Sequence, residues 1–361
     1  MKLGIVGLPN AGKTTVFNAL THAGALATAY AFSAAEANHG VVPVPDERLD
    51  RLHAALQTPK CVHATIDVID IPGLASGAGH GEGLGARFLA EIRGVDALAH
   101  VVRAFDNPEV AFVRDHIDPL ADVRDVETEL ILSDIELIER RKDKTAKAAR
   151  SGDKAAQKEM VVLDRVVATL GDGAFARTVE RGKEEESIFR DLALLTERPV
   201  LFVLDTDEDH LEGEGDDLIE LAKARGDEVV ALPAKLEVEL AELTAAEAAE
   251  FRGELGIPAG GVDELIAACY RVLGYITFFT GDHKSSETRA WQLPQGQTAW
   301  QAAGRIHGDI QKGFVRAEVV PLEDTVACRS FAHAREKGVL RVEGKDYVVR
   351  DGDVIHFRHT A

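Results

Sequence analysis

The chain has 361 residues, 45% hydrophobic and 28% charged, a balance typical of globular proteins and unlike that of disordered, collagen-like or disulfide-stapled chains. Its 41 Lys and Arg against 61 Asp and Glu give a formal net charge of −20, which argues against a protein that coats DNA or a membrane by bulk charge. The length predicts two or three domains. With three cysteines, no apparent targeting segment and no apolar stretch of about 20 residues, we expect a cytoplasmic protein with reduced thiols.

The N-terminal part of the chain carries a phosphate-binding motif. An apolar strand predicted at residues 3–6 runs into GLPNAGKTT, where four residues separate Gly7 from Gly12, and Lys13 and Thr14 follow. The glycines let backbone N–H groups curl around phosphate oxygens, the lysine places a positive charge at the β- and γ-phosphates, and the threonine hydroxyl is a Mg²⁺ ligand. A helix is predicted directly after this loop, with its dipole at the phosphates. The residues expected to contact nucleotide here are Asn10, Ala11, Gly12, Lys13, Thr14 and Thr15.

A second motif follows the strand predicted at residues 64–69. Asp70 and Gly73 form the Asp-x-x-Gly pattern of switch-type P-loop proteins, in which the aspartate holds Mg²⁺ and the glycine amide contacts the γ-phosphate. The glycine-rich stretch GLASGAGHGEGLG, which begins at Gly73, predicts a mobile loop. This motif, and the lack of an Arg-rich lid after the P-loop, favour a switch NTPase over the rival interpretation, a P-loop kinase.

The middle of the chain predicts an antiparallel helical hairpin. Apolar residues recur at helical spacing over 122–139 and again over 161–170, with Ser151-Gly152 between them. From Arg140 to Lys158 the chain has eight basic and two acidic residues, a local charge of +6. Such a basic tip is either a solvated helix surface or a contact for RNA, and both alternatives stay open.

The last part of the chain predicts a small β-rich module. Trp291 and Trp300 are expected in its core, and no metal-ligand cluster is apparent among the His and Cys residues. The predicted elements are strands at 275–280, 289–293, 316–320, 339–342, 348–349 and 354–357, with a helix at 298–313.

Taken together, these segments resemble the Obg-like ATPase family, the YchF group. The resemblance rests on GLPNAGKTT, on GVVPVPDERLD at 40–50, on DIPGLASGAGHGEGLGARFLAEIRGVDALAHVVRAF at 70–105, and on 289–320 and 343–357, which resemble the family's TGS domain. It implies an α/β fold with a doubly wound, mostly parallel P-loop domain at 1–120 and 190–274. It also implies a helical arm at 121–189, a β-grasp TGS domain at 275–361, and the ribosome or ribosomal RNA as partner, without membrane or DNA.

The resemblance also identifies the base-recognition segment. The strand predicted at 199–204 leads into Asp205-Thr206-Asp207-Glu208, where GTPases carry Asn-Lys-x-Asp and the YchF group carries an ATP-preferring Asn-x-x-Glu. Asp205 replaces the Asn, Glu208 keeps the family position, and Thr206 lies between them. The alternative is a register slipped by one residue, with Asp207 as the guanine-binding carboxylate. Ala234 belongs to the loop that resembles the one closing over the base.

Several positions depart from the family pattern or leave the catalytic group open. Ala34 stands where the family has the first switch's Mg²⁺-binding Thr, and Ser33 where it has a cysteine. Leu74 follows the second motif, and its apolar side chain cannot orient a water. The family also has an apolar residue at this position. Phe112 matches the family's hydrolysis-linked His, so His80 is the better candidate, with His116 as a further one.

We therefore expect a purine-nucleotide-binding switch NTPase that slowly hydrolyses ATP, or GTP, with Mg²⁺. The expected catalytic residues are Lys13, Gly73 and His80, and the expected Mg²⁺ ligands are Thr14 and Asp70. The alternative, motivated by Ala34 and Phe112, is a degenerate nucleotide-binding adaptor with little or no hydrolysis.

Overall fold

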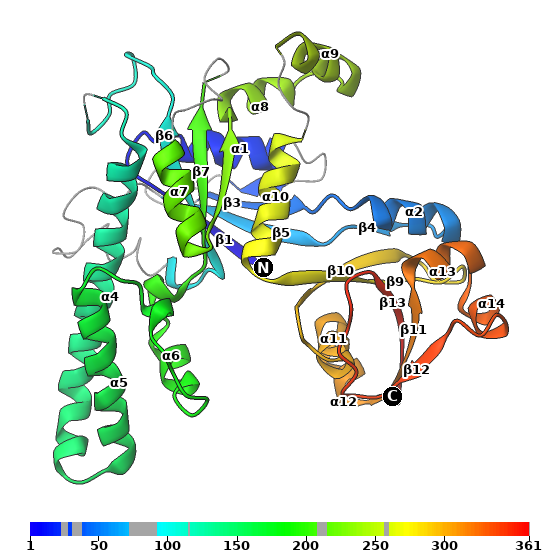
Figure 1. The fold of residues 1–361 in the computed structure, drawn as a ribbon. Coiled ribbons are helices and arrows are strands. Elements are labelled where there is room, and N and C mark those ends of the chain that lie inside the picture. Colours follow the sequence, from blue (N-terminus) through cyan, green and yellow to red (C-terminus); the bar gives the residue numbers. More distant parts are fainter. Residues whose placement is uncertain are drawn as a thin grey trace. The chain divides into compact units, whose positions relative to one another are not determined.

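The computed structural model describes residues 1–22, 28–30, 38–71, 92–114, 116–207, 215–255 and 260–360. Its contacts divide the chain into two units, Met1–Val42 with Asp67–Ala268, and Pro43–Ile66 with Cys269–Ala361. The segment Pro43–Ile66 thus groups with the C-terminal residues, although the sequence-based division placed it in the nucleotide domain. Figure 1 shows the elements of both units.

A mixed, mostly parallel sheet forms the centre of the first unit. Its parallel pairs are β1–β5, β1–β6, β6–β7 and β7–β8, and β2 pairs with β3 antiparallel. In the described part of the chain the strand order is β2 (Thr28–Tyr30), β3 (Asn38–Pro43), β5 (Thr65–Asp70), β1 (Lys2–Val6), β6 (Ala97–Ala104), β7 (Val200–Thr206) and β8 (Glu228–Leu232). Every residue of β6 is buried, as expected for a central parallel strand. The carboxyl ends of β1, β5 and β7 carry the three predicted nucleotide motifs.

Helices pack on this sheet and extend from it. Helix α4 contacts β6 and α7, and α1 contacts β1 and α8. Val123, Val126 and Leu130 of α4 belong to the same core cluster as the side chains of β6 and β7. The helix bounds are α1 (Lys13–His22), α4 (Pro119–Arg150), α5 (Lys154–Gly171), α6 (Glu186–Leu192), α7 (Asp216–Arg225), α8 (Ala234–Leu240), α9 (Ala245–Leu255) and α10 (Gly261–Val272), with 3-10 turns η2 (Ala176–Thr178) and η3 (Leu195–Glu197).

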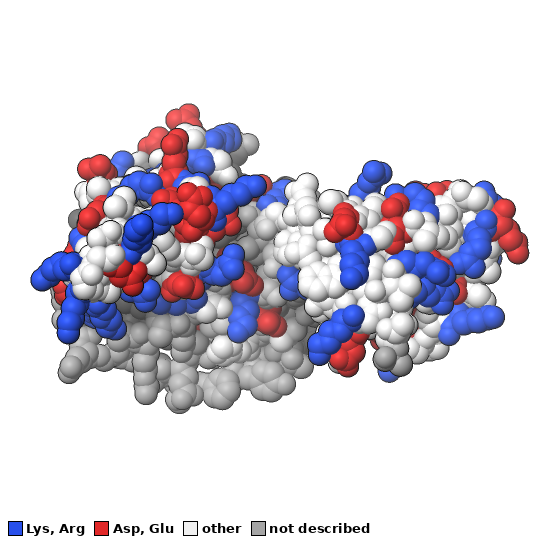
Figure 2. Space-filling model, turned by 90° about the horizontal axis from the view of Figure 1, so that it is seen from below, with Lys and Arg blue, Asp and Glu red and all other residues white. Residues whose placement is uncertain are grey.

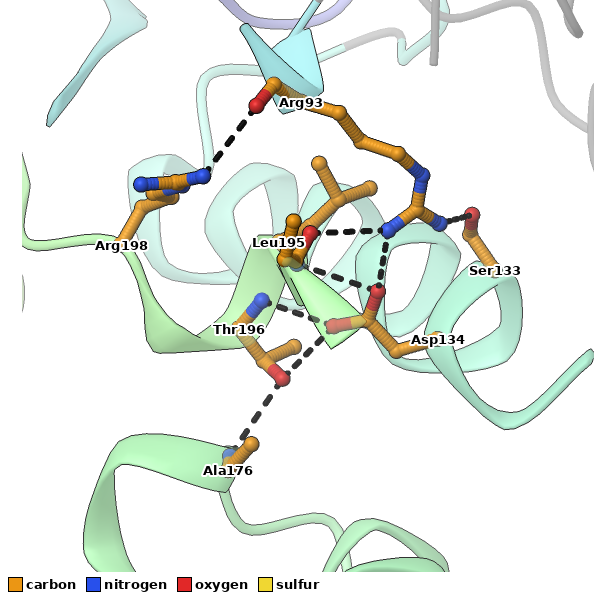
Figure 3. A network of polar contacts seen from close by, with 8 residues as sticks. Arg93, Ser133, Asp134, Ala176, Leu195, Thr196 and Arg198 are labelled. Atoms are coloured by element: carbon orange, nitrogen blue, oxygen red, sulfur yellow. Dashed lines mark hydrogen bonds and ion pairs between the residues drawn. The ribbon is translucent and has the colours of Figure 1, made fainter. Parts of the chain in front are cut away.

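Helices α4 and α5 form the predicted antiparallel hairpin, drawn as a long projecting pair in Figure 1. A buried polar network holds its base (Figure 3). The fully buried Asp134 of α4 accepts hydrogen bonds from the backbone N–H groups of Leu195 and Thr196, at 3.0 and 2.8 Å, and from the Thr196 hydroxyl at 2.8 Å. Arg93 forms an ion pair with the same carboxylate at 3.2 Å. Because these donors satisfy the buried charge, the first half of α4 is fixed to the sheet and the second half forms the arm.

The second unit is built on another mixed sheet. Its strand order in the described residues is β12 (Arg341–Glu343), β11 (Phe314–Pro321), β13 (Asp353–His359), β9 (Tyr275–Thr280), β10 (Thr288–Pro294) and β4 (Cys61–Val62). Helix α11 (Ala299–Ile306) packs on β10 and β11, as expected for the β-grasp module. The other helices are α2 (Glu47–Leu56), α12 (Gly308–Lys312), α13 (Leu322–Cys328) and α14 (Phe331–Glu336).

Two details of this unit differ from the prediction. Trp300 is 42% exposed and lies outside the core, because the small Ala299, Ala302 and Ala303 form the buried face of α11. The residues predicted as a strand at 348–349 make only an isolated bridge, between Thr298 and Val348. No helix in the described ranges has the length and apolarity needed to cross a membrane.

Candidate nucleotide site

The P-loop joins β1 to α1 in the predicted strand-loop-helix arrangement. Gly7 has φ +152°, and a Cβ there would lie 2.4 Å from the carbonyl oxygen of Val101. Asn10 adopts a left-handed backbone with φ 62°, and its side-chain amide donates to the carbonyl of Ala111 at 2.8 Å. Ala11 is buried. The loop is therefore fixed against neighbouring segments on both sides, which preorganises its backbone N–H groups.

Lys13 lies inside the curl of this loop. Its side chain is almost fully buried, and Nζ donates to the carbonyl of Leu8 at 2.7 Å. Burial lowers the pKa of the ammonium to about 8, and the nearby Asp70 carboxylate opposes this shift only in part. A buried, incompletely compensated positive charge at this position is suited to binding phosphate oxygens.

The two predicted Mg²⁺ ligands meet at the end of β5. The Thr14 hydroxyl donates to Oδ2 of Asp70 at 2.9 Å, and the Asn38 side-chain amide lies 3.3 Å from the same oxygen. A hydroxyl and a carboxylate are the hard oxygen donors that Mg²⁺ prefers, and this ion usually keeps waters and phosphate oxygens as its other ligands. The residues present therefore fit the implied metal: Thr14 and Asp70 would hold it, and it would offset phosphate charge.

The segment predicted to recognise the base meets the P-loop at Asp205. This buried side chain, at the end of β7, accepts a hydrogen bond from the N–H of Ala234 at 3.1 Å. Its pKa rises to about 7, because burial disfavours the carboxylate; the Ala234 hydrogen bond opposes this, and the charge of Asp207 adds to it. The hydroxyl of Thr206 is buried without a hydrogen-bond partner among the described residues. Asp205, Thr206 and Ala234 thus lie together, as the sequence suggested.

Asp207 points to a different neighbour. Its Oδ2 accepts from the backbone N–H of Asp106 at 2.9 Å, in the loop that follows β6. This contact occupies one carboxylate oxygen that a register slipped by one residue would need for guanine.

Two residues that the sequence did not single out lie close to this site. His100 of β6 is buried beside Phe202, and its Nε2 has no hydrogen-bond partner in the described ranges. Burial, helped by the charge of Lys13, lowers the pKa of His100 to about 3, so the ring is neutral at physiological pH. Arg103 is also buried, and it donates to the carbonyls of Phe105, Asn107 and Val110. For both residues, the signal in the sequence was a polar side chain within an otherwise apolar strand.

The catalytic group is the least defined part of the site. Phe112, which the sequence resemblance matches to the family's His, is partly buried, and its ring centre lies 4.8 Å from the guanidinium of Arg103. His116 is exposed. Gly73, His80 and Glu208 lie outside the described residues, as do Ser33, Ala34 and Leu74.

The basic tip of the arm is partly neutralised. Arg140 pairs with Glu136, Arg141 with Glu159 at 2.6 Å, and Lys142 with both Glu139 and Asp164. Figure 2, which views the whole molecule from below, shows basic and acidic side chains mixed over the face that it draws. Within the described chain no carboxylate lies within 4.0 Å of the amino or guanidinium groups of Lys144, Lys147, Arg150 or Lys154. The unbalanced charge is therefore concentrated around the turn.

The fold and the motif at its strand ends define a P-loop protein of the GTPase type. The family described as "50S ribosome-binding GTPase" matches residues 2–138, and the YchF-GTPase C-terminal family, described as a protein of unknown function, matches 275–360. The chain is 43% identical to the ribosome-binding ATPase YchF of Bacillus subtilis over 360 residues, covering 98% of each chain. It is 44% identical to the Haemophilus influenzae protein of the same name over 359 residues, covering 99% of this chain and 98% of the relative. The chain belongs to the YchF family.

A solved structure supports this assignment. The Schizosaccharomyces pombe YchF GTPase superposes with a TM-score of 0.84 at 32% sequence identity, covering 99% of this chain and 97% of that chain. The bacterial relatives are named ATPases, whereas the Schizosaccharomyces pombe protein is named a GTPase.

Proposed function

We propose that this chain is a Mg²⁺-dependent ATPase of low turnover whose nucleotide state controls its association with the ribosome. The observation that carries the proposal is the arrangement of Lys13, Thr14 and Asp70. A buried cation inside the P-loop, next to a paired hydroxyl and carboxylate, is the set of groups that binds the β- and γ-phosphates and Mg²⁺ in switch NTPases. The names of the bacterial relatives support ATP hydrolysis and ribosome binding.

ATP is favoured over GTP by the contacts of the two aspartates of the base segment. Asp205 is buried against the P-loop and bonded to the Ala234 N–H, and Asp207 is bonded to the Asp106 N–H. GTPases use one carboxylate to accept both guanine donors, and an aspartate already committed to a backbone N–H suits that role poorly. Adenine needs one acceptor and one donor, which backbone groups near Thr206 can supply. Asp205, Thr206, Glu208 and Ala234 are our proposed base-site residues.

Hydrolysis in this proposal depends on stabilisation of the phosphates more than on a general base. Lys13 and the Gly73 amide would stabilise charge on the γ-phosphate, and His80 is the proposed residue for positioning the water. Without a Mg²⁺-binding Thr at Ala34, we expect slow turnover. The ribosome is the proposed partner, with the arm between Arg140 and Lys158 as its contact, and such a partner implies a cytoplasmic protein.

Phosphate release tests the proposal. Wild-type protein should release phosphate from ATP in a Mg²⁺-dependent reaction, and unlabelled ATP should displace a fluorescent nucleotide better than GTP does. Lys13→Ala should bind triphosphate roughly tenfold to a hundredfold more weakly, because a charge-assisted contact worth about 1.5–3 kcal/mol is lost. Unchanged calorimetric affinity in this variant would exclude the P-loop assignment. A GTP preference that is lost in Asp207→Ala would support the slipped register instead.

One observation favours the second candidate, a nucleotide-binding adaptor without useful turnover. The position of the family's His is taken by Phe112, which packs between the core and Arg103 and has no group that binds water. Phe112→His separates the two functions. If the wild type binds ATP without releasing phosphate and this variant gains turnover, the chain is an adaptor.

A further inference from the structure

An aspartate, a cysteine and a histidine meet in the second unit. Asp50 lies on α2, Cys61 in β4, and His63 just after that strand; Figure 1 shows α2 and β4 next to each other. One ligand atom of each residue lies within 4.8 Å of the other two. Oδ1 of Asp50 is 3.9 Å from Nε2 of His63. The sequence suggested no metal cluster among the His and Cys residues, because the third ligand is an aspartate from a preceding helix.

The imidazole of His63 is held in the tautomer that a metal requires. Its Nδ1 lies 3.2 Å from the carbonyl oxygen of Val44. A carbonyl oxygen can only accept, so Nδ1 carries the proton and the neutral ring keeps its lone pair on Nε2, which faces Asp50. Metal-binding histidines commonly donate their other ring nitrogen to a backbone carbonyl in this way.

The backbone around Cys61 and His63 is fixed on two sides. Strand β4 pairs with β10, with Cys61 opposite Thr288. The residue after His63 is also held, because the N–H of Val44 donates to the carbonyl of Ala64 at 2.8 Å. Cys61 and His63 are two residues apart in an extended segment, so their side chains leave the backbone on the same side. Asp50 is exposed on its helix and can rotate toward them.

We propose that Asp50, Cys61 and His63 form a Zn²⁺ site that clamps α2 to β4. Carboxylate oxygen, thiolate sulfur and imidazole nitrogen are all regular Zn²⁺ ligands, and three protein ligands leave the fourth tetrahedral position to water. The hard cations Mg²⁺ and Ca²⁺ bind oxygen donors and do not select a thiolate. The separations here exceed those between ligands of a bound ion, so binding closes the cluster by a side-chain rotation of Asp50.

Zn²⁺ binding at this site forms a sulfur–zinc bond with Cys61 as the S–H bond of the thiol breaks, and the proton passes to solvent.

The test uses the full-length chain, stripped with a chelator and kept reduced, with Mg²⁺ in excess to occupy oxygen-only sites. Competition against a chromophoric chelator should detect one tight Zn²⁺ per chain. Co²⁺ in its place should show the thiolate-to-cobalt charge-transfer absorption. Cys61→Ser should abolish this absorption. Asp50→Asn should weaken Zn²⁺ binding by at least about 10–100-fold, because even the loss of a residue that only supports a metal ligand costs that much affinity.

Matched variants in the same unit serve as controls. Cys328→Ala removes a buried thiol, and His307→Gln an exposed imidazole, and both should bind Zn²⁺ like the wild type. Asp50 is exposed, so Asp50→Asn should fold with wild-type stability in the absence of metal, and its affinity can be compared directly. Equal Zn²⁺ affinities in wild type, Cys61→Ser and Asp50→Asn, or a Co²⁺ spectrum without the charge-transfer absorption, would overturn the proposal.

Discussion

The α-carbon of Gly12 lies directly against the carboxylate of Asp205. A Cβ on residue 12 would be 1.9 Å from Oδ2 and 2.9 Å from Cγ of that side chain. Gly12 also has φ +95°, a conformation that side-chain-bearing residues rarely adopt. The P-loop and the end of β7 therefore meet at a separation that only glycine permits.

Gly12→Ala should distort the P-loop. The positive φ alone costs roughly 1–2 kcal/mol in any residue other than glycine. Gly152, in the turn between α4 and α5, has φ +92° and open space around its α-carbon, so Gly152→Ala measures that cost by itself. We expect Gly12→Ala to be destabilised by about 1–3 kcal/mol more than Gly152→Ala in urea unfolding, because of the overlap with Asp205.

The same pair of variants separates binding from stability. Gly152→Ala should bind ATP like the wild type. Gly12→Ala should bind about tenfold or more weakly, since a displaced loop loses at least one charge-assisted contact to phosphate. Equal stability and equal affinity of the two variants would show that the loop accommodates a methyl group beside Asp205.

Asp205→Asn should remove a pH dependence of stability. A free Asp titrates near 3.8, whereas in the fold the pKa of Asp205 is about 7. Between these values the folded chain holds a proton that the unfolded chain has released, so this group makes stability fall as pH rises from about 4 to about 7, with no further change above. Asn does not titrate, and its Oδ1 can still accept from the Ala234 N–H.

Urea unfolding at about pH 5 and about pH 8 measures this effect. The stability of Asp205→Asn relative to the wild type should be greater at the higher pH, and the variant should also bind ATP more tightly there. If the difference in unfolding free energy between Asp205→Asn and the wild type is the same at both pH values, then Asp205 is ionised in the folded chain at both.

The parts of the fold that the sequence predicted are those set by local pattern. Apolar runs located β1, β5 and β7, and helical spacing located the hairpin, because burial on one or both faces imposes those periods. The addition of β4 to the C-terminal sheet was not predictable in this way. It depends on a parallel pairing between Cys61 and Thr288, which lie far apart in sequence and carry no shared pattern.

In the candidate site, too, the motifs contiguous in sequence were predictable, and the contacts between distant segments were not. The spacing of Gly7, Gly12 and Lys13 indicated the P-loop, because the motif is contiguous in sequence. The contact of Asp205 with Gly12 brings segments far apart in the sequence together, and only their packing reveals it. Asp205 could be located from sequence, but its raised pKa could not, since this follows from burial.

The affinity for ATP should fall at high pH because of Lys13. The pKa of its ammonium is about 8 without nucleotide, and bound phosphate favours the charged form, so binding above this pH takes up a proton. Isothermal titration calorimetry should show an ATP affinity that is nearly constant below about pH 7 and that falls by up to about tenfold per pH unit above about pH 8. Lys13→Ala should bind weakly with no such fall; an equal fall in both would assign the titration to another group.

The arm should bind ribosomes through its unpaired charges. Charge reversal at Arg140, Arg141, Lys144 and Lys147 together should weaken co-sedimentation with ribosomes and leave ATP affinity unchanged, because the arm lies away from the P-loop motif. Contacts to RNA phosphates release counterions, so binding should also weaken steeply with added salt.

Splitting this set into two double variants sharpens the test. Arg140 and Arg141 already contact Glu136 and Glu159, so much of their charge is compensated within the arm. Lys144 and Lys147 have no such partner among the described residues, and their charge is available to phosphate. We therefore expect Lys144→Gln with Lys147→Gln to weaken co-sedimentation more than Arg140→Gln with Arg141→Gln, and to make its salt dependence shallower. If neither double variant nor added salt changes co-sedimentation, the basic tip is a solvated helix surface.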